Sequence, residues 1–163
     1  VYGGARCHGL QVNATWPPPN ELALFRHRFP GALDARLVLQ LGPGALGEMS
    51  YRPRAIAERI RDDYGDVITD VLVDVSGGRG IAITDPTQIR YLVDELYGHG
   101  TWGVGVAGGL CAETLWTIAP LLADHPDLSI DAEGRLRDDA PGGGNLCINK
   151  VRAYIEAASE IVR

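Results

Sequence analysis

Asp74, a carboxylate at the end of an apolar strand, is the residue of this chain that is best placed to take part in a reaction. Asp74 closes the apolar run DVLVD, and a Gly-rich segment, SGGRG over residues 76–80, follows almost at once. A carboxylate there points either into a ligand site or into the interior, where burial without a partner is costly. Partial burial would raise its pKa and suit it to act as a general acid. The alternative is a structural Asp that caps its own loop through hydrogen bonds.

Two further predicted strands end in glycine-bearing loops of the same kind. Ala107 is followed by Gly108-Gly109-Leu110, and Asp131 is followed by Ala-Glu-Gly. Parallel strands present ligands at their carboxyl edge, and glycines let successive backbone N–H groups converge on an anion. A helix expected soon after Gly109 would add its N-terminal dipole. Three such loops in order predict a phosphate monoester ligand, whereas glycines that only turn strands into helices are the alternative.

Other polar residues in apolar surroundings are weaker candidates. Gln11 and Gln40 lie inside apolar strands and could be ligand-orienting amides or hydrogen-bonded core amides. Cys7 and His8 have the chemistry of a nucleophile pair, but adjacent residues of a strand point to opposite faces. Cys111 lies close to the predicted phosphate loop, where a small buried hydrophobe is the more usual role.

The elements that position these residues alternate between strand and helix. Apolar runs predict strands over residues 9–13, 36–41, 70–75, 101–107 and 128–132, and 3.6-residue periodicity with capping signals predicts helices over 20–29, 53–64, 86–97, 113–123 and 148–162. The glycines and proline of residues 42–47 predict a loop, and Pro30-Gly31 predicts the end of the first helix. Each unit takes about 30 residues, the length of a βαβ repeat. The fold class is therefore α/β with a parallel sheet.

Composition limits the classes of partner. The formal net charge is −6 and Lys150 is the only lysine, so nucleic acid and anionic membrane surfaces are not expected partners. The three cysteines contain no CxxC pair, which argues against a disulfide framework or a zinc site and favours a cytoplasmic location. No apolar run is long enough to cross a bilayer. The residues therefore give no indication of a zinc site.

The length and the start of the chain shape the expected domain. The 163 residues are enough for one domain, but five units do not close an eight-stranded barrel, which typically needs ~250 residues. The chain begins at Val1 without a Met. We therefore expect a single barrel domain over 1–163 that is truncated at its N-terminus, with an open five-stranded sheet as the alternative. Exposed edges of an incomplete barrel would invite formation of a homodimer.

These loops together resemble the phosphoribosylanthranilate isomerase family. Asp74 with its Gly-Gly-x-Gly turn resembles the sixth strand of that (β/α)₈ barrel, and Val106 to Leu110 resemble its seventh-strand phosphate loop. Asp131 to Gly134 are similar to its eighth-strand motif, and Gly9 to Asn13 are similar to its fourth strand. The resemblance implies an incomplete TIM barrel that contains the equivalents of strands four to eight.

The resemblance also implies an activity and roles for individual residues. Members of that family catalyse an Amadori rearrangement of a phosphoribosylated aromatic amine in tryptophan biosynthesis. They use a first-strand Cys as the general base and need no metal or organic cofactor, so the resemblance implies none for this chain. Asp74 would be the general acid that protonates the ribose ring oxygen. The residues expected to bind the phosphorylated substrate are Gln11, Gly77, Gly78, Gly80, Gly108, Gly109, Asp131 and Gly134.

The chain departs from the family pattern in three places. The first strand and its base are absent, and Asn13 follows Gln11-Val12 where the family usually continues with His-Gly. Glu133 stands where small hydroxyl residues are usual, and its charge would repel a phosphate unless it pairs with Arg135 or Arg137. A non-catalytic barrel that binds phosphate or a nucleotide is therefore the alternative function.

Overall fold

The structure, a computed structural model, describes residues 8–28, 35–83, 85–139 and 143–161. Cys7 and the predicted stop at Pro30-Gly31 lie outside these ranges. The strands are β1 Gly9–Val12, β2 Arg36–Leu41, β3 Asp70–Asp74, β4 Gly103–Ala107 and β5 Ser129–Asp131. The α-helices are α1 Pro19–Arg28, α2 Pro43–Glu48, α3 Pro53–Tyr64, α4 Thr87–His99, α5 Ala119–Asp124 and α6 Ile148–Ile161, with short 3₁₀ turns η3 Leu115–Thr117 and η4 Gly134–Leu136.

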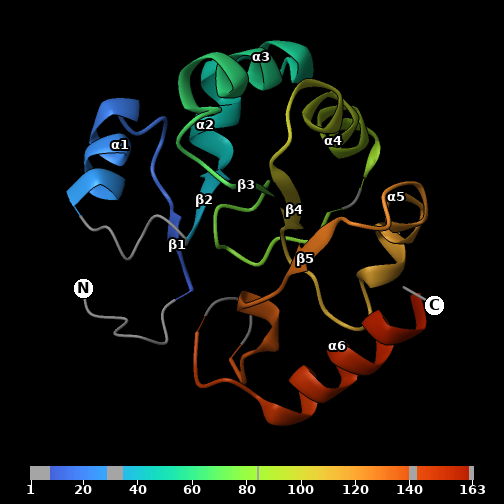
Figure 1. Ribbon diagram of the computed structural model, residues 1–163. Coiled ribbons are helices and arrows are strands. Elements are labelled where there is room, and N and C mark those ends of the chain that lie inside the picture. Colours follow the sequence, from blue (N-terminus) through green and yellow to red (C-terminus); the bar gives the residue numbers. More distant parts are fainter. Residues whose placement is uncertain (1–7, 29–34, 84, 140–142, 162–163) are drawn as a thin grey trace.

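The five strands form one parallel sheet in the order β1-β2-β3-β4-β5. Each strand pairs with the next strand of the sequence, so the strand order does not reverse within the sheet. The strands follow an arc with α1 to α5 around its outer side, while α6 lies below β5 (Figure 1). The predicted alternation of strands and helices in an α/β fold is confirmed.

The outer face of the sheet builds the core against the helices. In β2, Leu37, Leu39 and Leu41 alternate along the strand and are at most 2% exposed. They belong to one cluster with the buried side chains of α3 and α4, among them Ile60 and Leu96. Burial of each such side chain stabilises the fold by roughly 1.5–3 kcal/mol before entropy is counted. The inner face carries mostly polar and small residues, together with the side chains of Val38 and Leu72.

Register places two acidic residues and one small residue in a row on that inner face. Asp74 of β3 pairs with Ala107 of β4, and Ala107 pairs with Asp131 of β5. Register partners on neighbouring strands point to the same face of a sheet. The concave side of the sheet therefore carries a carboxylate on each side of Ala107 at its carboxyl edge.

Two expectations about local structure were wrong. Residues 43–48 form helix α2 where a loop was predicted, because Pro43 occupies the first turn, where its fixed φ favours a helix and no N–H is needed. The helix predicted over 113–123, with a kink or early end at Pro120, is instead the 3₁₀ turn η3 followed by α5, which begins at Ala119 and has Pro120 in its first turn. No α-helix therefore starts directly after Gly109, and the expected N-terminal dipole at that loop is missing.

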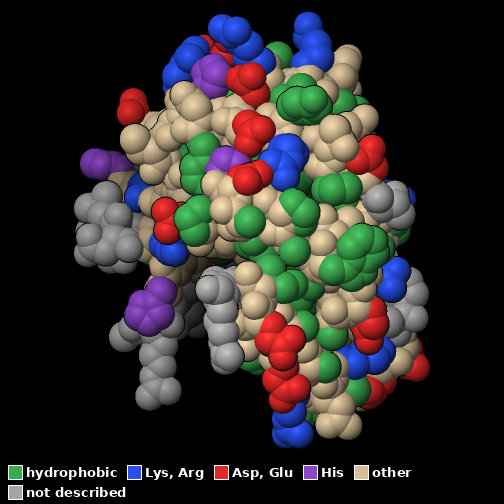
Figure 2. Space-filling view, turned by 90° about the vertical axis from the view of Figure 1, so that its right-hand side faces the viewer, with side chains coloured by type: hydrophobic (Ala, Val, Ile, Leu, Met, Phe, Trp, Pro, Cys, Tyr) green, Lys and Arg blue, Asp and Glu red, His purple; other side chains and the backbone are tan. Residues whose placement is uncertain are grey.

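Helix α6 lies below β5 in Figure 1 and packs against η3 and η4 with only part of its surface. Tyr154, Ala157, Ala158 and Ile161 pack against the core, but none of its residues is fully buried. Figure 2 shows hydrophobic side chains gathered on the face that carries α4, α5 and α6, and Tyr91, Trp116 and Ile155 are at least 59% exposed. With 14 residues α6 is the longest helix, and no helix of the described residues is long and apolar enough to cross a membrane.

One buried hydrogen bond fastens the segment after β1 to the helical layer. The Tyr64 hydroxyl of α3 donates to the Pro17 carbonyl at 2.7 Å, and Tyr64 is 1% exposed. The neighbouring Trp16 donates through Nε1 to the Ala45 carbonyl, and the Arg59 guanidinium lies 4.1 Å from its ring centre. These contacts position β1 and therefore Gln11.

Replacing Tyr64 with Phe should lower the free energy of unfolding by about 1–2 kcal/mol, because it leaves the buried Pro17 carbonyl without its donor. The matched control is Tyr91→Phe, at a residue that is 60% exposed, and it should change the value by less than about 0.5 kcal/mol. Urea unfolding of both variants measures the difference. Equal midpoints for the two variants would contradict the assigned role of Tyr64.

Candidate functional site

A polar cavity of about 110 Å³ lies at the carboxyl edge of the sheet. Its walls come from the ends of the strands and the loops after β3, β4 and β5. All of the residues predicted for the site line it except Gly77. The lining consists of Gln11, Asn13, Gln40, Asp74, Ser76, Gly78, Gly80, Ala107, Gly108, Gly109, Asp131, Glu133 and Gly134.

The Asp74 carboxylate is held by its own loop. Oδ1 accepts hydrogen bonds from the Ser76 amide at 2.9 Å, the Ser76 hydroxyl at 2.8 Å and the Gly77 amide at 3.1 Å. Oδ2 accepts from the Gly78 amide at 2.8 Å. The positive φ angles of Gly77 and Gly78, 60° and 79°, let these amides turn back toward the carboxylate. The amides of Gly77 and Gly78 are therefore occupied by a protein anion.

A chain of amides continues from Asp74 across the concave face. Gln40 Nε2 donates to Asp74 Oδ2 at 2.8 Å, and Gln11 Nε2 donates to Gln40 Oε1 at 2.7 Å. Gln40 is 4% exposed, whereas Gln11 is exposed and reaches the cavity. The sequence left two roles open for each glutamine, orienting a ligand or filling the core. In the structure Gln40 is a core amide whose oxygen and nitrogen are both hydrogen-bonded, whereas Gln11 is accessible to a ligand.

The five donors around Asp74 define its chemistry. Together they fill the acceptor positions of an ionised carboxylate, and a proton on either oxygen would displace at least one of them. Asp74 is 4% exposed. These contacts order the loop and align Gln40, as expected from the alternative of a structural Asp that caps its own loop, and the general-acid role stays a prediction.

The loops after β4 and β5 keep free amides at the cavity. Among the described residues, the N–H groups of Gly109 and Gly134 donate no hydrogen bond. Gly109 has a φ of 58°, and its Cα lies so close to the loop after β3 that an added Cβ would meet the Ala82 nitrogen at 2.5 Å. Thr114 holds the β4 loop by donating to the Gly109 carbonyl and accepting from the Cys111 amide, each at 2.9 Å. These bonds favour turns over a helix in this segment.

Asp131 faces the cavity from β5 in a different environment from Asp74. The residue is exposed overall, but protein atoms strip part of the hydration from its carboxyl group. That burial raises the pKa of Asp131, and the nearby charges of Asp74 and Glu133 raise it further. The Tyr154 hydroxyl of α6 is buried without a hydrogen-bond partner among the described residues. Burial and the Asp131 charge raise the pKa of Tyr154 to about 12.

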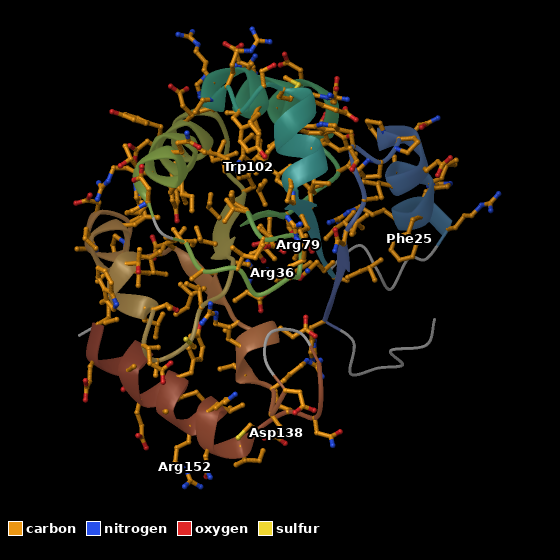
Figure 3. All side chains as sticks on the ribbon, turned by 180° about the vertical axis from the view of Figure 1, so that it is seen from behind. Phe25, Arg36, Arg79, Trp102, Asp138 and Arg152 are labelled. Atoms are coloured by element: carbon orange, nitrogen blue, oxygen red, sulfur yellow. The ribbon has the colours of Figure 1, made fainter. Side chains whose placement is uncertain are left out.

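Glu133 and its neighbours form contacts that reduce its repulsion of an anion. Arg137 Nη2 contacts Glu133 Oε1 at 2.6 Å, so Glu133 is paired with one of the two arginines considered for it. Arg135 donates through Nε to the Gly80 carbonyl at 2.9 Å and ties the β5 loop to the β3 loop. Arg79 lies by the strands in Figure 3, whereas Asp138 and Arg152 lie out beside α6. Arg79 is exposed, and its Nε donates to the Ser76 carbonyl.

A second cavity of about 390 Å³ adjoins the first along the concave face. The two share Gln11 and Asp131, and the second extends down to Arg36 and Asp70. The Arg36 guanidinium makes two contacts with the Asp70 carboxylate, one of them from Nε at 2.8 Å. An added Cβ at Gly103 would meet Asp70 Oδ1 at 2.3 Å, so a small residue of β4 makes room for this ion pair.

Sequence reasoning missed several contributors to the site. Ser76 donates twice to Asp74, and its position two residues after an Asp is the signal of a loop that turns back on the carboxylate. Tyr154 is distant in sequence, and nothing in the periodicity of α6 distinguishes its hydroxyl from that of a core Tyr. The described residues contain no group of three His, Cys, Asp or Glu side chains that could hold a metal ion.

Comparisons with protein-family models, with curated proteins and with solved structures found no match to this chain.

Gly109→Ala should lower the free energy of unfolding by roughly 3 kcal/mol or more, because a left-handed φ and a clash with the backbone at Ala82 act together. Gly78→Ala is the matched control: its φ is also positive, but no atom lies within 4 Å of an added Cβ. It should cost only about 1–2 kcal/mol. Denaturant titration compares them. A Gly109 variant as stable as the Gly78 variant would show that the β3 and β4 loops are not in close contact.

Proposed function

We propose that this chain is part of a (β/α)₈-type barrel that binds a phosphoribosylated small molecule and isomerises it in an Amadori-type rearrangement. The observation that carries the proposal is the cavity at the carboxyl edge, where free loop amides lie beside two carboxylates. The family resemblance of the loops supports the same reading.

The strand order supports a barrel over a doubly wound sheet. In doubly wound folds the strand order reverses at a switch point, and the ligand lies in the crevice there. Here each of the five strands neighbours the next strand in sequence, and the helices α1 to α5 follow the outer side of the arc. This is the arrangement of consecutive units in a singly wound barrel, with the ligand cavity inside the carboxyl edge.

The phosphate is best placed between the loops after β4 and β5. The amides of Gly77 and Gly78 are engaged by Asp74, so the donors that remain at the cavity include those of Gly109 and Gly134. Unpaired amides in a concave loop form a favourable site for an anion even in an acidic chain. With the phosphate there, the sugar would lie over Ala107, between Gln11 and Asp131.

Non-catalytic binding of a phosphate or nucleotide is the second candidate function. It is favoured by the full set of donors around Asp74, which suits a structural carboxylate. Incubation with a phosphoribosylated aromatic amine separates the two functions. A new ketone carbon resonance in the ¹³C NMR spectrum supports isomerisation, and binding without that resonance supports the second function.

Binding of ribose 5-phosphate to the full chain should be measurable by isothermal titration, with a Kd in the range of about 1 μM to 1 mM that is typical of enzyme substrates. Ala107→Leu should weaken it at least tenfold, because the larger side chain fills the space between Asp74 and Asp131. Excess inorganic phosphate should compete with the sugar phosphate.

The matched control is Ala123→Leu on the exposed side of α5, which should leave the Kd unchanged. Circular dichroism checks that both variants fold. Undiminished binding by a folded Ala107→Leu protein would remove the ligand from this cavity. Binding of neither ribose 5-phosphate nor a ribonucleoside monophosphate by the unmodified chain would refute both candidate functions.

A further inference from the structure

The two carboxylates of the site differ in their ability to give up a proton to a ligand. Asp74 is buried and its two oxygens accept five hydrogen bonds from Gln40, Ser76, Gly77 and Gly78. A proton there has no free position and no path to the cavity that does not displace a donor. The general-acid role expected from the sequence is therefore poorly matched to Asp74.

Asp131 has the opposite properties. It accepts no side-chain hydrogen bond from the described residues, it is exposed, and it lines both cavities of the concave face. Register places it two strands from Asp74 across Ala107, a separation of about 10 Å at the usual strand spacing. A bound sugar between the two strands would contact Asp131 on one side.

We propose that Asp131 is the carboxyl group that holds the proton and donates it to the bound sugar, and that Asp74 is a positioning residue that orders the β3 loop and Gln40. This inference rests on the proposed function, and it assigns the acid of that reaction to a residue other than the one that the loop resemblance implies.

The charges around Asp131 favour the protonated form. Asp74 from β3 and Glu133 from its own loop are both acidic, and burial acts in the same direction, so the pKa of Asp131 is raised. The Ala132 amide opposes this effect, and the Tyr154 hydroxyl of α6 is uncharged near neutral pH because its pKa is about 12. Arg137 is engaged by Glu133, Arg36 by Asp70 and Arg135 by the Gly80 carbonyl, so none of these three cations is paired with Asp131. A protonated carboxyl also relieves repulsion between the site and an incoming phosphate.

The proton enters the reaction at ring opening of the phosphoribosylated amine. The nitrogen lone pair forms the C1=N bond, the C1–O bond breaks, and the departing ring oxygen takes the proton from Asp131. The products are an iminium ion with a free hydroxyl group and the Asp131 carboxylate, so charge and atoms balance. General acid catalysis of such a step typically contributes a factor of about 10²–10⁴.

Carboxyl ¹³C NMR of the full chain tests where the proton resides, independently of any ligand. The Asp131 resonance, assigned with Asp131→Asn, should titrate above the ordinary Asp value, and the midpoint should fall in Glu133→Gln because one negative neighbour is removed. Glu133 is an exposed side chain, so this variant should fold even where Asp74→Asn does not. A midpoint at or below the ordinary value would overturn the inference.

The pH dependence of ribose 5-phosphate binding tests whether the proton is donated to the ligand. If Asp131 donates a hydrogen bond, the Kd of the unmodified chain rises by up to tenfold per pH unit above its midpoint, because the donor form is lost. The Asp131→Asn protein keeps only the pH dependence of the ligand phosphate and so serves as the control. Identical pH profiles for the two proteins would refute proton donation by Asp131.

Turnover completes the test and separates the two proposals. With a phosphoribosylated aromatic amine, Asp131→Asn should lose about 10²–10⁴-fold in kcat/KM and the alkaline limb of the pH profile. A chain that binds ribose 5-phosphate with the Asp131-dependent pH profile but shows no turnover refutes the isomerase function and supports the placement of the proton. Full activity of Asp131→Asn refutes the assignment of the acid while leaving the isomerase function intact.

Discussion

The capture of the Asp74 carboxylate by its own loop is the interaction on which the site depends. A buried carboxylate without partners would be too costly to keep, and five hydrogen bonds offset that cost. The same bonds fix the positive-φ turn at Gly77 and Gly78 and orient Gln40, which in turn orients Gln11. One ionic group thereby aligns the ends of β1, β2 and β3, and it leaves the loops after β4 and β5 as the place for the phosphate that we propose.

Small residues of β4 decide where a ligand can lie. Gly103, Gly105 and Ala107 alternate with the buried Val104 and Val106, so the strand contributes a full outer face to the core and almost nothing to the inner face. Added Cβ atoms at Gly103 and Gly105 would meet the side chains of Asp70 and Leu72. The side chains of the neighbouring strand therefore occupy the space directly beside these two glycines, and at Ala107 the two carboxylates face the cavity at the carboxyl edge.

The predictions from sequence succeeded where a pattern reports a local and repeated constraint. Alternating apolar runs and helical periodicity predicted the order of strands and helices, and parallel topology then brought Gln11, Asp74, Gly109 and Asp131 to one cavity. They failed where one residue outweighed the pattern of the segment around it. Pro43 starts a helix in a Gly-rich segment for which a loop was predicted, and the hydrogen bonds of Thr114 hold turns where the periodicity favoured a helix. The different roles that we propose for Asp74 and Asp131 could not be predicted from the sequence. They depend on which hydrogen-bond donors each carboxylate meets in three dimensions.

Three acidic side chains, Asp74, Asp131 and Glu133, lie at the cavity where we propose that a phosphate binds. The repulsion between each of them and the phosphate is reduced in a different way. Asp74 is neutralised in effect by loop dipoles that point at it, and Glu133 is paired with Arg137. Asp131 has no cationic partner among the described residues and is opposed in its protonation only by the Ala132 amide, so a bound proton is the main way to lower its repulsion. The charge of the ligand and the proton on Asp131 are then linked: a phosphate that approaches Gly109 and Gly134 favours protonation of Asp131, and a protonated Asp131 favours the phosphate. In the function that we propose, an acidic loop that would weaken a site built only for binding becomes useful, because that site must deliver a proton.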